Sequence, residues 1–274
     1  MKLSNALAIA VPSILGICVA LVPTLVSLLI RPWLVFNPHE ISKLFMSYVW
    51  VVFSDGIDKG DAKVKKDLVE GDAYGVVLDI GAGHGHGVQY LNPSRVKQYI
   101  ALEPNTHMHP RIRAKANSAG FFESDGRLVI LGCGAEDTDT ILATLRSNST
   151  DPDSKGPHLV DTIVSIFTLC SVPNPANTIQ ALVQDVLKPD GLFLYYEHVK
   201  SERDDIVWWQ SFWTPIWGGL FGGCCIDRPT DKVIRDMRDG AGNKSMWKEA
   251  KQWDNEDDDP EELFKRTLGK FIKA

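Results

Sequence analysis

The stretch Leu78–Gly87 reads LDIGAGHGHG and decides how the rest of the chain is interpreted. It overlaps a short apolar run, VVLDI at 76–80, which predicts a buried strand ending at a glycine-rich turn. A dinucleotide fingerprint requires glycines in the spacing G-x-G-x-x-G. Neither Gly81 nor Gly83 is followed by a glycine five positions later. The loop therefore does not match a site for a pyrophosphate-containing dinucleotide.

Four more apolar runs follow the first at intervals filled by helical patterns. They predict strands at 99–102, 128–131, 162–167 and 192–196. Alternating strands and helices indicate an α/β fold with a mostly parallel, doubly wound sheet. Ligands of such sheets bind beyond the carboxyl ends of the strands. The glycine-rich loop is expected to lie at that edge.

The glycines alternate, and an acid precedes them, in the pattern Asp79-x-Gly81-x-Gly83-x-Gly85. This pattern resembles the cofactor loop of class I S-adenosylmethionine-dependent methyltransferases, which have a Rossmann-like fold. Glycines without a Cβ let the backbone approach the methionine and ribose parts of the cofactor. Asp79 is expected to receive the cofactor's amino group, directly or through water. Glu103, at the end of the second strand, is expected to accept hydrogen bonds from both ribose hydroxyls.

Other segments extend this resemblance in the expected order. Gly134–Asp137 follows the third strand, where methyltransferases of this class hold adenine, so Ala135 and Glu136 are candidate adenine contacts. The turn LKPDG, at 187–191, leads into the fifth strand. The resemblance implies S-adenosyl-L-methionine as the cofactor.

From Val77 onward the chain resembles the microsomal thiol methyltransferases, the methyltransferase-like seven family. The resemblance rests on FTLCSV at 167–172, EHV at 197–199 and WQSFWTPIWGGLFGGCCIDR at 209–228. It places Phe167 at the cofactor site. It implies methyl transfer to a small lipophilic thiol or hydroxyl on the cytosolic face of the endoplasmic reticulum or lipid droplets. Two alternatives remain open. One is O-methylation of polyketide-derived secondary metabolites, and the other is a non-catalytic cofactor-binding scaffold.

The acceptor determines which catalytic residues are needed. A thiol ionises readily and needs little help from a base. An alcohol needs more help, and His198 and Glu197 are then the candidate bases. Four tryptophans are expected to line an apolar acceptor pocket or to enter a membrane, with some of them explained by ordinary core packing: Trp208, Trp209, Trp213 and Trp217. The segment Lys232–Pro260 does not match the family pattern and is expected to shape the acceptor pocket.

The N-terminal segment Ala6–Ile30 carries no charged residue and is long enough to cross a bilayer core as a helix. Pro12 and Pro23 are expected to kink it, which also permits a bent anchor in one leaflet. A buried core helix is the alternative. The expected organisation is a membrane anchor at 1–31, amphipathic linker helices at 32–75 and a methyltransferase domain at 76–274.

Composition limits the other partners. A net charge of −6 gives no support to nucleic-acid binding, which usually requires a basic face. Five scattered cysteines match no metal-site spacing and favour a reducing compartment. The pairs His84/His86 and His107/His109 follow neighbouring strands, but the first loop already serves the cofactor. No metal is predicted.

Overall fold

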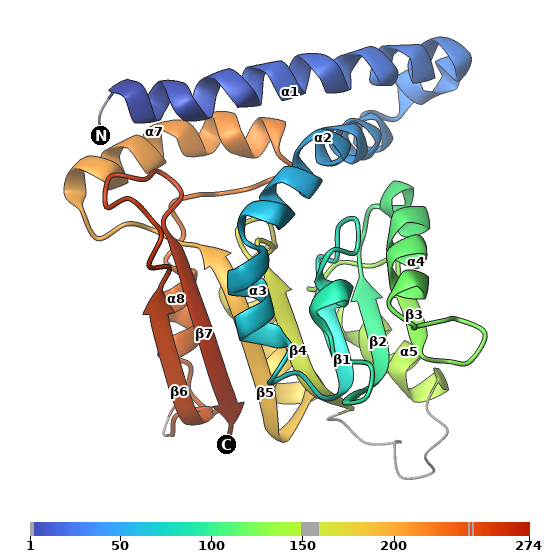
Figure 1. The fold of residues 1–274 in the computed structure, drawn as a ribbon, viewed down its shortest axis with the longest axis vertical. Helices are drawn as coiled ribbons and strands as arrows, with labels where there is room; N and C mark the ends of the chain where they lie inside the picture. Colours follow the sequence, from blue (N-terminus) through green and yellow to red (C-terminus); the bar gives the residue numbers. More distant parts are fainter. Residues whose placement is uncertain (1–2, 149–158, 241, 243) are drawn as a thin grey trace.

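The computed structural model describes residues 3–148, 159–240, 242 and 244–274, with side chains of the first helix described from residue 14. Most of a polar insertion expected at Ser147–His158 lies outside these residues. The described chain forms a seven-stranded sheet in the order β3-β2-β1-β4-β5-β7-β6 (Figure 1). Its strands are β1 Gly75–Ile80, β2 Val96–Leu102, β3 Leu128–Leu131, β4 Val160–Ile166, β5 Leu187–His198, β6 Trp247–Asp254 and β7 Arg266–Lys273.

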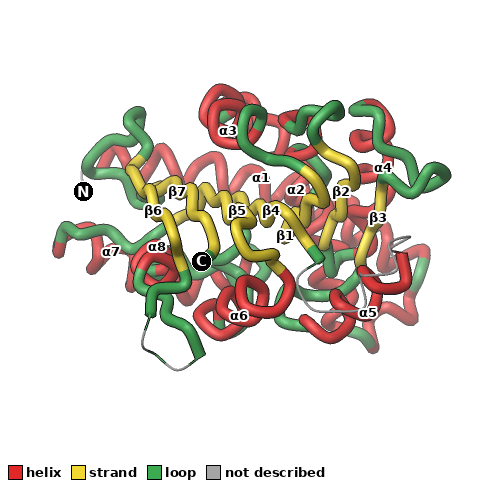
Figure 2. The backbone as a smooth tube through the Cα atoms, turned by 90° about the horizontal axis from the view of Figure 1, so that it is seen from below, coloured by secondary structure: helices red, strands yellow, loops and turns green. Residues whose placement is uncertain are grey.

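The first five strands are parallel, and β7 is antiparallel to both of its neighbours. This arrangement confirms the predicted α/β methyltransferase-type sheet. The five predicted strands all exist, although several extend further than their apolar runs. Helices cover both faces (Figure 2), and two clusters of buried aliphatic and aromatic side chains fill the layers between them and the sheet. The covering helices are α3 Ala62–Val69 and α4 His109–Ser118 on one face, and α5 Thr138–Asn148, α6 Pro175–Ala181 and α8 Thr230–Arg235 on the other.

Short helical turns complete the connections between the longer elements. Three are 3₁₀ turns: η1 Pro32–Phe36, η2 Gly87–Tyr90 and η3 Thr106–Met108. A π-helical turn, η4 at Leu182–Val186, continues α6 and leads into β5. The predicted LKPDG turn is thus the first part of β5. Asp190 takes a left-handed conformation there, with φ of 58°.

The segment Lys232–Pro260 does not shape the acceptor pocket as expected. It contributes the end of α8 and the edge strand β6, which pairs with β7. No residue of this segment lines the cavity described below. The cause is topological, because β6 is the edge strand and β7 lies between it and the parallel strands, so β6 itself does not reach the cavity.

Two long helices precede the sheet. α1 (Leu3–Ile30) continues through both prolines and packs along α2 (Pro38–Gly60), so the expected kinks do not interrupt the helix. Each proline removes only one backbone donor. Small buried residues, Gly16, Ala20 and Thr24, lie four positions apart on one face of α1. A Cβ on Gly16 would lie 2.1 Å from the ring of Phe53 on α2, so this face permits close helix packing.

The opposite side of α1 is apolar and exposed, with Leu15, Val22 and Leu29 each more than half accessible. Within the part of the chain that the structure describes, no helix is both long and apolar enough to cross a membrane. The predicted spanning anchor is therefore not confirmed. Figure 1 shows α1, α2 and α7 (Asp204–Leu220) lying across the end of the sheet where the parallel strands terminate.

Candidate active site

A cavity of about 880 Å³ opens at the carboxyl ends of the parallel strands. One part is lined by the loops that follow β1, β2, β3 and β4, as predicted for a cofactor site in an open α/β sheet. The other part is lined by α2, by the end of α7 and by the residues that lead into β7. The cavity therefore joins a polar end built on the sheet to a largely apolar end built by helices.

The glycine-rich loop forms part of the polar end. Gly81 and Gly83 line the cavity with positive φ values of 67° and 55°. An added Cβ would lie 2.4 Å from the Thr168 side chain at Gly81, and 2.7 Å from Trp50 Nε1 at Gly83. The backbone at both positions takes a conformation that favours glycine, and the missing Cβ lets Thr168 and Trp50 pack closely against the loop that lines the cavity.

Gly85, the third glycine of the motif, has a different role. Its φ is 78°, and an added Cβ would lie 2.9 Å from the Ile112 Cα on α4. Gly85 does not line the cavity. The glycine at this position of the motif allows the loop to pack closely on α4. The predicted contact between Gly85 and the cofactor is therefore not supported by this geometry.

Glu103 both lines the cavity and braces the glycine loop. Its Oε2 accepts a hydrogen bond from the Gly83 amide at 2.8 Å, and its Oε1 accepts one from the Asn105 amide at 2.8 Å. Burial raises the pKa of Glu103, while these two amides oppose the rise. Each carboxylate oxygen retains lone pairs, so two ribose hydroxyls still find acceptors at this position.

Asp79 lies beside a smaller adjoining cavity, which shares Gly81, Gly83 and Phe167 with the larger one. Tyr99 donates its hydroxyl hydrogen to Asp79 Oδ2 at 2.7 Å. Burial raises the pKa of Asp79 to about 7, against the effect of that hydrogen bond. A cationic amino group placed here would favour the ionised carboxylate, so this position suits the methionine end of the cofactor.

The adenine segment and the exit of β4 line the same cavity, with contributions from Ala135, Glu136 and Phe167. Phe167 has a φ of 53°, which is uncommon for a residue with a side chain. Its ring stacks on His198 at a centroid distance of 4.5 Å. Such strain often marks a ligand site, and Phe167 lines both the larger and the smaller cavity.

The two candidate bases occupy different environments. Glu197 is fully buried and does not line the cavity, and its carboxylate accepts hydrogen bonds from Ser165 Oγ at 2.6 Å and from the amides of Thr168 and Leu169 at 3.0 and 3.1 Å. Glu197 thus braces the loop that follows β4. His198 lines the cavity, and its buried Nδ1 has no hydrogen-bond partner.

The environment of His198 makes it a weak base. Burial lowers its pKa to about 3, and the positive charge of Arg266 contributes to the shift. Phe167 and Phe264 flank the ring at centroid distances of 4.5 and 5.2 Å. The imidazole therefore remains neutral at physiological pH and binds a proton poorly.

Sequence patterns missed most of the apolar end. α2, expected to be a linker helix, supplies Met46, Trp50 and Phe53 to the cavity wall. Phe264 and Arg266 come from the chain leading into β7. The sequence shows that α2 contains aromatic residues. Which part of the protein these residues face depends on how the helix crosses the sheet, and the sequence does not show that.

The tryptophans of α7 separate into three groups. Trp217 lines the cavity and stacks on Phe221 at a centroid distance of 4.1 Å. Trp209 and Trp213 pack against a small buried cluster that includes Cys170 and Cys224. Trp208 points outward and is 60% exposed. Trp217 thus lines a cavity as predicted, whereas entry of these tryptophans into a membrane stays a prediction.

The two histidine pairs make ordinary polar contacts. His84 Nδ1 lies 3.2 Å from Ser54 Oγ, and His107 Nε2 lies 2.7 Å from Glu40 Oε1. His86 approaches Asp55 and Asp58 at 3.3 Å, and His109 Nε2 lies 2.8 Å from the Glu103 carbonyl oxygen. Within the described ranges, no group of three or more His, Cys, Asp or Glu side chains is arranged to hold a metal ion.

Two human thiol S-methyltransferases are similar in sequence to parts of this chain. The human thiol S-methyltransferase TMT1B is 26% identical over 163 residues, which is 59% of this chain and 59% of that protein. The human thiol S-methyltransferase TMT1A is 36% identical over 78 residues, covering 27% of this chain and 31% of its own length. The chain therefore matches less than two thirds of the length of these relatives.

Solved structures match over a larger share of the fold. An O-methyltransferase family protein from Burkholderia thailandensis gives a TM-score of 0.56 at 13% identity, with 87% of this chain and 61% of that chain covered. The YcgJ protein from Bacillus subtilis gives 0.53 at 15% identity, with 79% and 99% covered. At these identities the likeness concerns the fold alone.

A family model described as "Methyltransferase domain" matches residues 61–228, which is more than half of the chain and spans the glycine loop, Glu103 and the exits of β4 and β5. The match agrees with the motifs read from the sequence, and with S-adenosyl-L-methionine as the cofactor that the open glycine cradle fits. The chain belongs to the methyltransferase domain family.

Proposed function

We propose that this protein transfers the methyl group of S-adenosylmethionine to a small lipophilic thiol. The observation that carries this proposal is the single cavity that joins the glycine cradle and Glu103 to an apolar wall containing Trp217, Phe221 and Phe264. The cofactor supplies a methyl group already activated by its sulfonium. The protein's part is to hold the acceptor sulfur in line with that carbon and to exclude water, and proximity and alignment account for most of the rate.

The environment of His198 favours a thiol over an alcohol. A histidine with a pKa of about 3 is a poor base for an alcohol, whereas a thiol ionises near neutral pH without help. Three hydrogen-bond donors hold the Glu197 carboxylate, and Glu197 does not line the cavity. It is therefore not placed to deprotonate a substrate bound there. The named activity of the two human relatives gives the same acceptor class independently.

We expect the purified chain, given labelled cofactor, to methylate lipophilic thiols far faster than matched alcohols. His198→Ala should reduce thiol turnover by less than about threefold, and raising the pH should recover the loss by ionising the substrate. For an alcohol acceptor, loss of a working base would instead cost about 10²- to 10⁴-fold. A preference for alcohols together with a loss of that size would support O-methylation. No product from either class, with intact cofactor binding, would support a non-catalytic scaffold.

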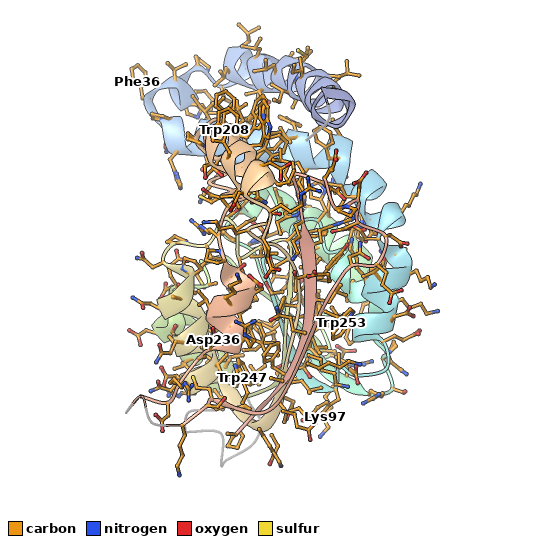
Figure 3. All side chains as sticks on the ribbon, turned by 90° about the vertical axis from the view of Figure 1, so that its left-hand side faces the viewer. Phe36, Lys97, Trp208, Asp236, Trp247 and Trp253 are labelled. Atoms are coloured by element: carbon orange, nitrogen blue, oxygen red, sulfur yellow. The ribbon has the colours of Figure 1, made fainter. Side chains whose placement is uncertain are left out.

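We also propose that the protein binds a lipid surface through α1 and α7, as an enzyme on the cytosolic face of the endoplasmic reticulum or of lipid droplets. The outer face of α1 is apolar, and η1 continues it with Trp33 and Phe36, which are 64% and 89% exposed. Figure 3 shows Phe36 and Trp208 near the same end of the molecule, far from Lys97. Aromatic residues at such a face are typical of membrane interfaces.

α7 adds a second exposed apolar stripe. Trp208, Phe212, Ile216 and Leu220 are 60%, 50%, 45% and 38% exposed, and their spacing of four places them on one helix face. No charged residue occurs between Ile206 and Ile226. The end of the same helix lines the acceptor end of the cavity, so a lipophilic acceptor dissolved in the membrane would have a short path to the site.

Replacing Trp208, Phe212 and Ile216 together with serine should lower binding to phosphatidylcholine vesicles by about tenfold or more, because three partly exposed apolar side chains no longer enter the lipid. Flotation of vesicles on a density gradient measures the bound fraction. Phe122→Ser is the matched control, because Phe122 is 41% exposed in the segment between α4 and β3. Equal loss in both variants, or none in the triple variant, would contradict lipid binding by α7.

A further inference from the structure

Two of the five cysteines meet in the wall of the cavity, although 54 positions separate them in the chain. Cys170 follows the exit of β4, and Cys224 follows the end of α7. Their Sγ atoms lie 3.3 Å apart, both residues are buried, and both line the cavity. The sequence, in which the cysteines look scattered, gives no sign of this pair.

The backbone around the pair is already held in place. The Cys225 amide donates to the Cys170 carbonyl oxygen at 2.9 Å. Arg228 Nη1 donates to the carbonyl oxygens of Leu169 and Val172 at 3.0 and 2.7 Å. These bonds fix the two segments side by side. A disulfide, with sulfurs about 2.05 Å apart, then requires a closing movement of the side chains of little more than an ångström.

We propose that Cys170 and Cys224 form a reversible disulfide across the acceptor end of the cavity when a hydroperoxide enters it. Two S–H bonds break and one S–S bond forms, so the protein loses two electrons and two protons. Hydrogen peroxide accepts both and leaves as two molecules of water. A dithiol reductant restores the pair.

The cavity provides the route for the oxidant, because both cysteines line it although they are largely shielded from bulk solvent. Contact with Cys224 and burial raise the pKa of the Cys170 thiol well above its usual value. Oxidation is therefore expected to be faster at alkaline pH, where more of the thiolate forms. Cys225 lies next in the chain but does not line the cavity, which makes it a matched control.

The disulfide closes a long loop and fixes one wall of the acceptor site. It should raise Tm by about 5–10 °C through its effect on the unfolded chain. It should also lower turnover of the acceptor severalfold while leaving cofactor affinity unchanged, because Glu103 and the glycine loop are not part of the link. Only this effect on turnover rests on the proposed function.

The test treats the full chain with hydrogen peroxide and maps disulfides by mass spectrometry of its peptides, before and after reduction. Wild type and Cys225→Ser should lose two hydrogen atoms and yield a 170–224 linked peptide, with the rise in Tm. Cys170→Ser and Cys224→Ser should show neither.

Three results would overturn the proposal: five free thiols in oxidised wild type, a link between Cys224 and Cys225, or a Tm rise that persists in Cys170→Ser. If the linked peptide forms in a chain that methylates no thiol or alcohol, the proposed function has failed and the disulfide stands. Cofactor binding measured by calorimetry on the same samples separates loss of the site from modification of its wall.

Discussion

Replacing Glu103 with alanine is expected to weaken S-adenosylmethionine binding by about ten- to hundredfold, which corresponds to about 1.5–3 kcal/mol for lost charge-assisted hydrogen bonds. The carboxylate lies at the end of β2, lines the cavity and holds the Gly83 amide at 2.8 Å. Its removal takes away the ribose acceptor and loosens the glycine loop. Titration calorimetry with the cofactor measures the change in affinity.

The same substitution leaves two buried amides without acceptors, so a lower Tm is also expected. Glu136→Ala is a control for the Tm change alone, because its loss exposes no buried donor of the glycine loop, whereas its place as a candidate adenine contact means that cofactor affinity can fall in this variant too. If Glu103→Ala binds the cofactor as tightly as wild type, Glu103 does not receive the ribose.

Glu197→Gln is expected to remove a pH dependence of folding stability worth about 2–3 kcal/mol between about pH 5 and about pH 8. Burial raises the pKa of Glu197 from 4.5 to about 7, while its three hydrogen-bond donors oppose the rise. The folded state therefore binds this proton more tightly than the unfolded state. The stability it contributes is fully present below about pH 4.5 and is lost as the pH rises through about 7.

Urea unfolding of both proteins across this range measures the effect. The glutamine stays neutral, so the free energy of unfolding of the variant should fall less with rising pH than that of wild type. The pKa of Asp79 is also raised to about 7 by burial, but Asp79 is present in both proteins and cancels in the difference. Parallel curves for the two proteins would mean that Glu197 does not titrate in this range.

Asp79 and Glu197 are both buried acids near the carboxyl ends of parallel strands, yet they have different roles. Asp79 faces a small cavity at the cofactor end, and Glu197 points into the loop after β4. His198, one residue later on β5, faces the cavity because successive side chains of a strand point to opposite faces. One strand position thus separates a residue that braces the site from one that lines it.

The sequence by itself determined the five parallel strands, the cofactor edge and the cofactor. Apolar runs bounded by glycines predicted β1 to β5, because the buried strands of a parallel sheet must be apolar on both faces. Local spacing also predicted the loop at Gly81 and Gly83 and the acid at Glu103, since a strand, its turn and the next strand end are fixed by short-range geometry. Asn37 caps α2 in the same local manner, because its side chain accepts a hydrogen bond from the Glu40 amide at 3.1 Å.

Only the tertiary structure decided the acceptor end. The wall contributed by α2, the separation of the α7 tryptophans and the pairing of Cys170 with Cys224 all join segments far apart in the chain. Such contacts depend on how whole helices cross the sheet, and no local pattern encodes that crossing. The same reason explains two departures from expectation: α1 packs along α2 through its small residues, and Lys232–Pro260 extends the sheet edge instead of lining the cavity.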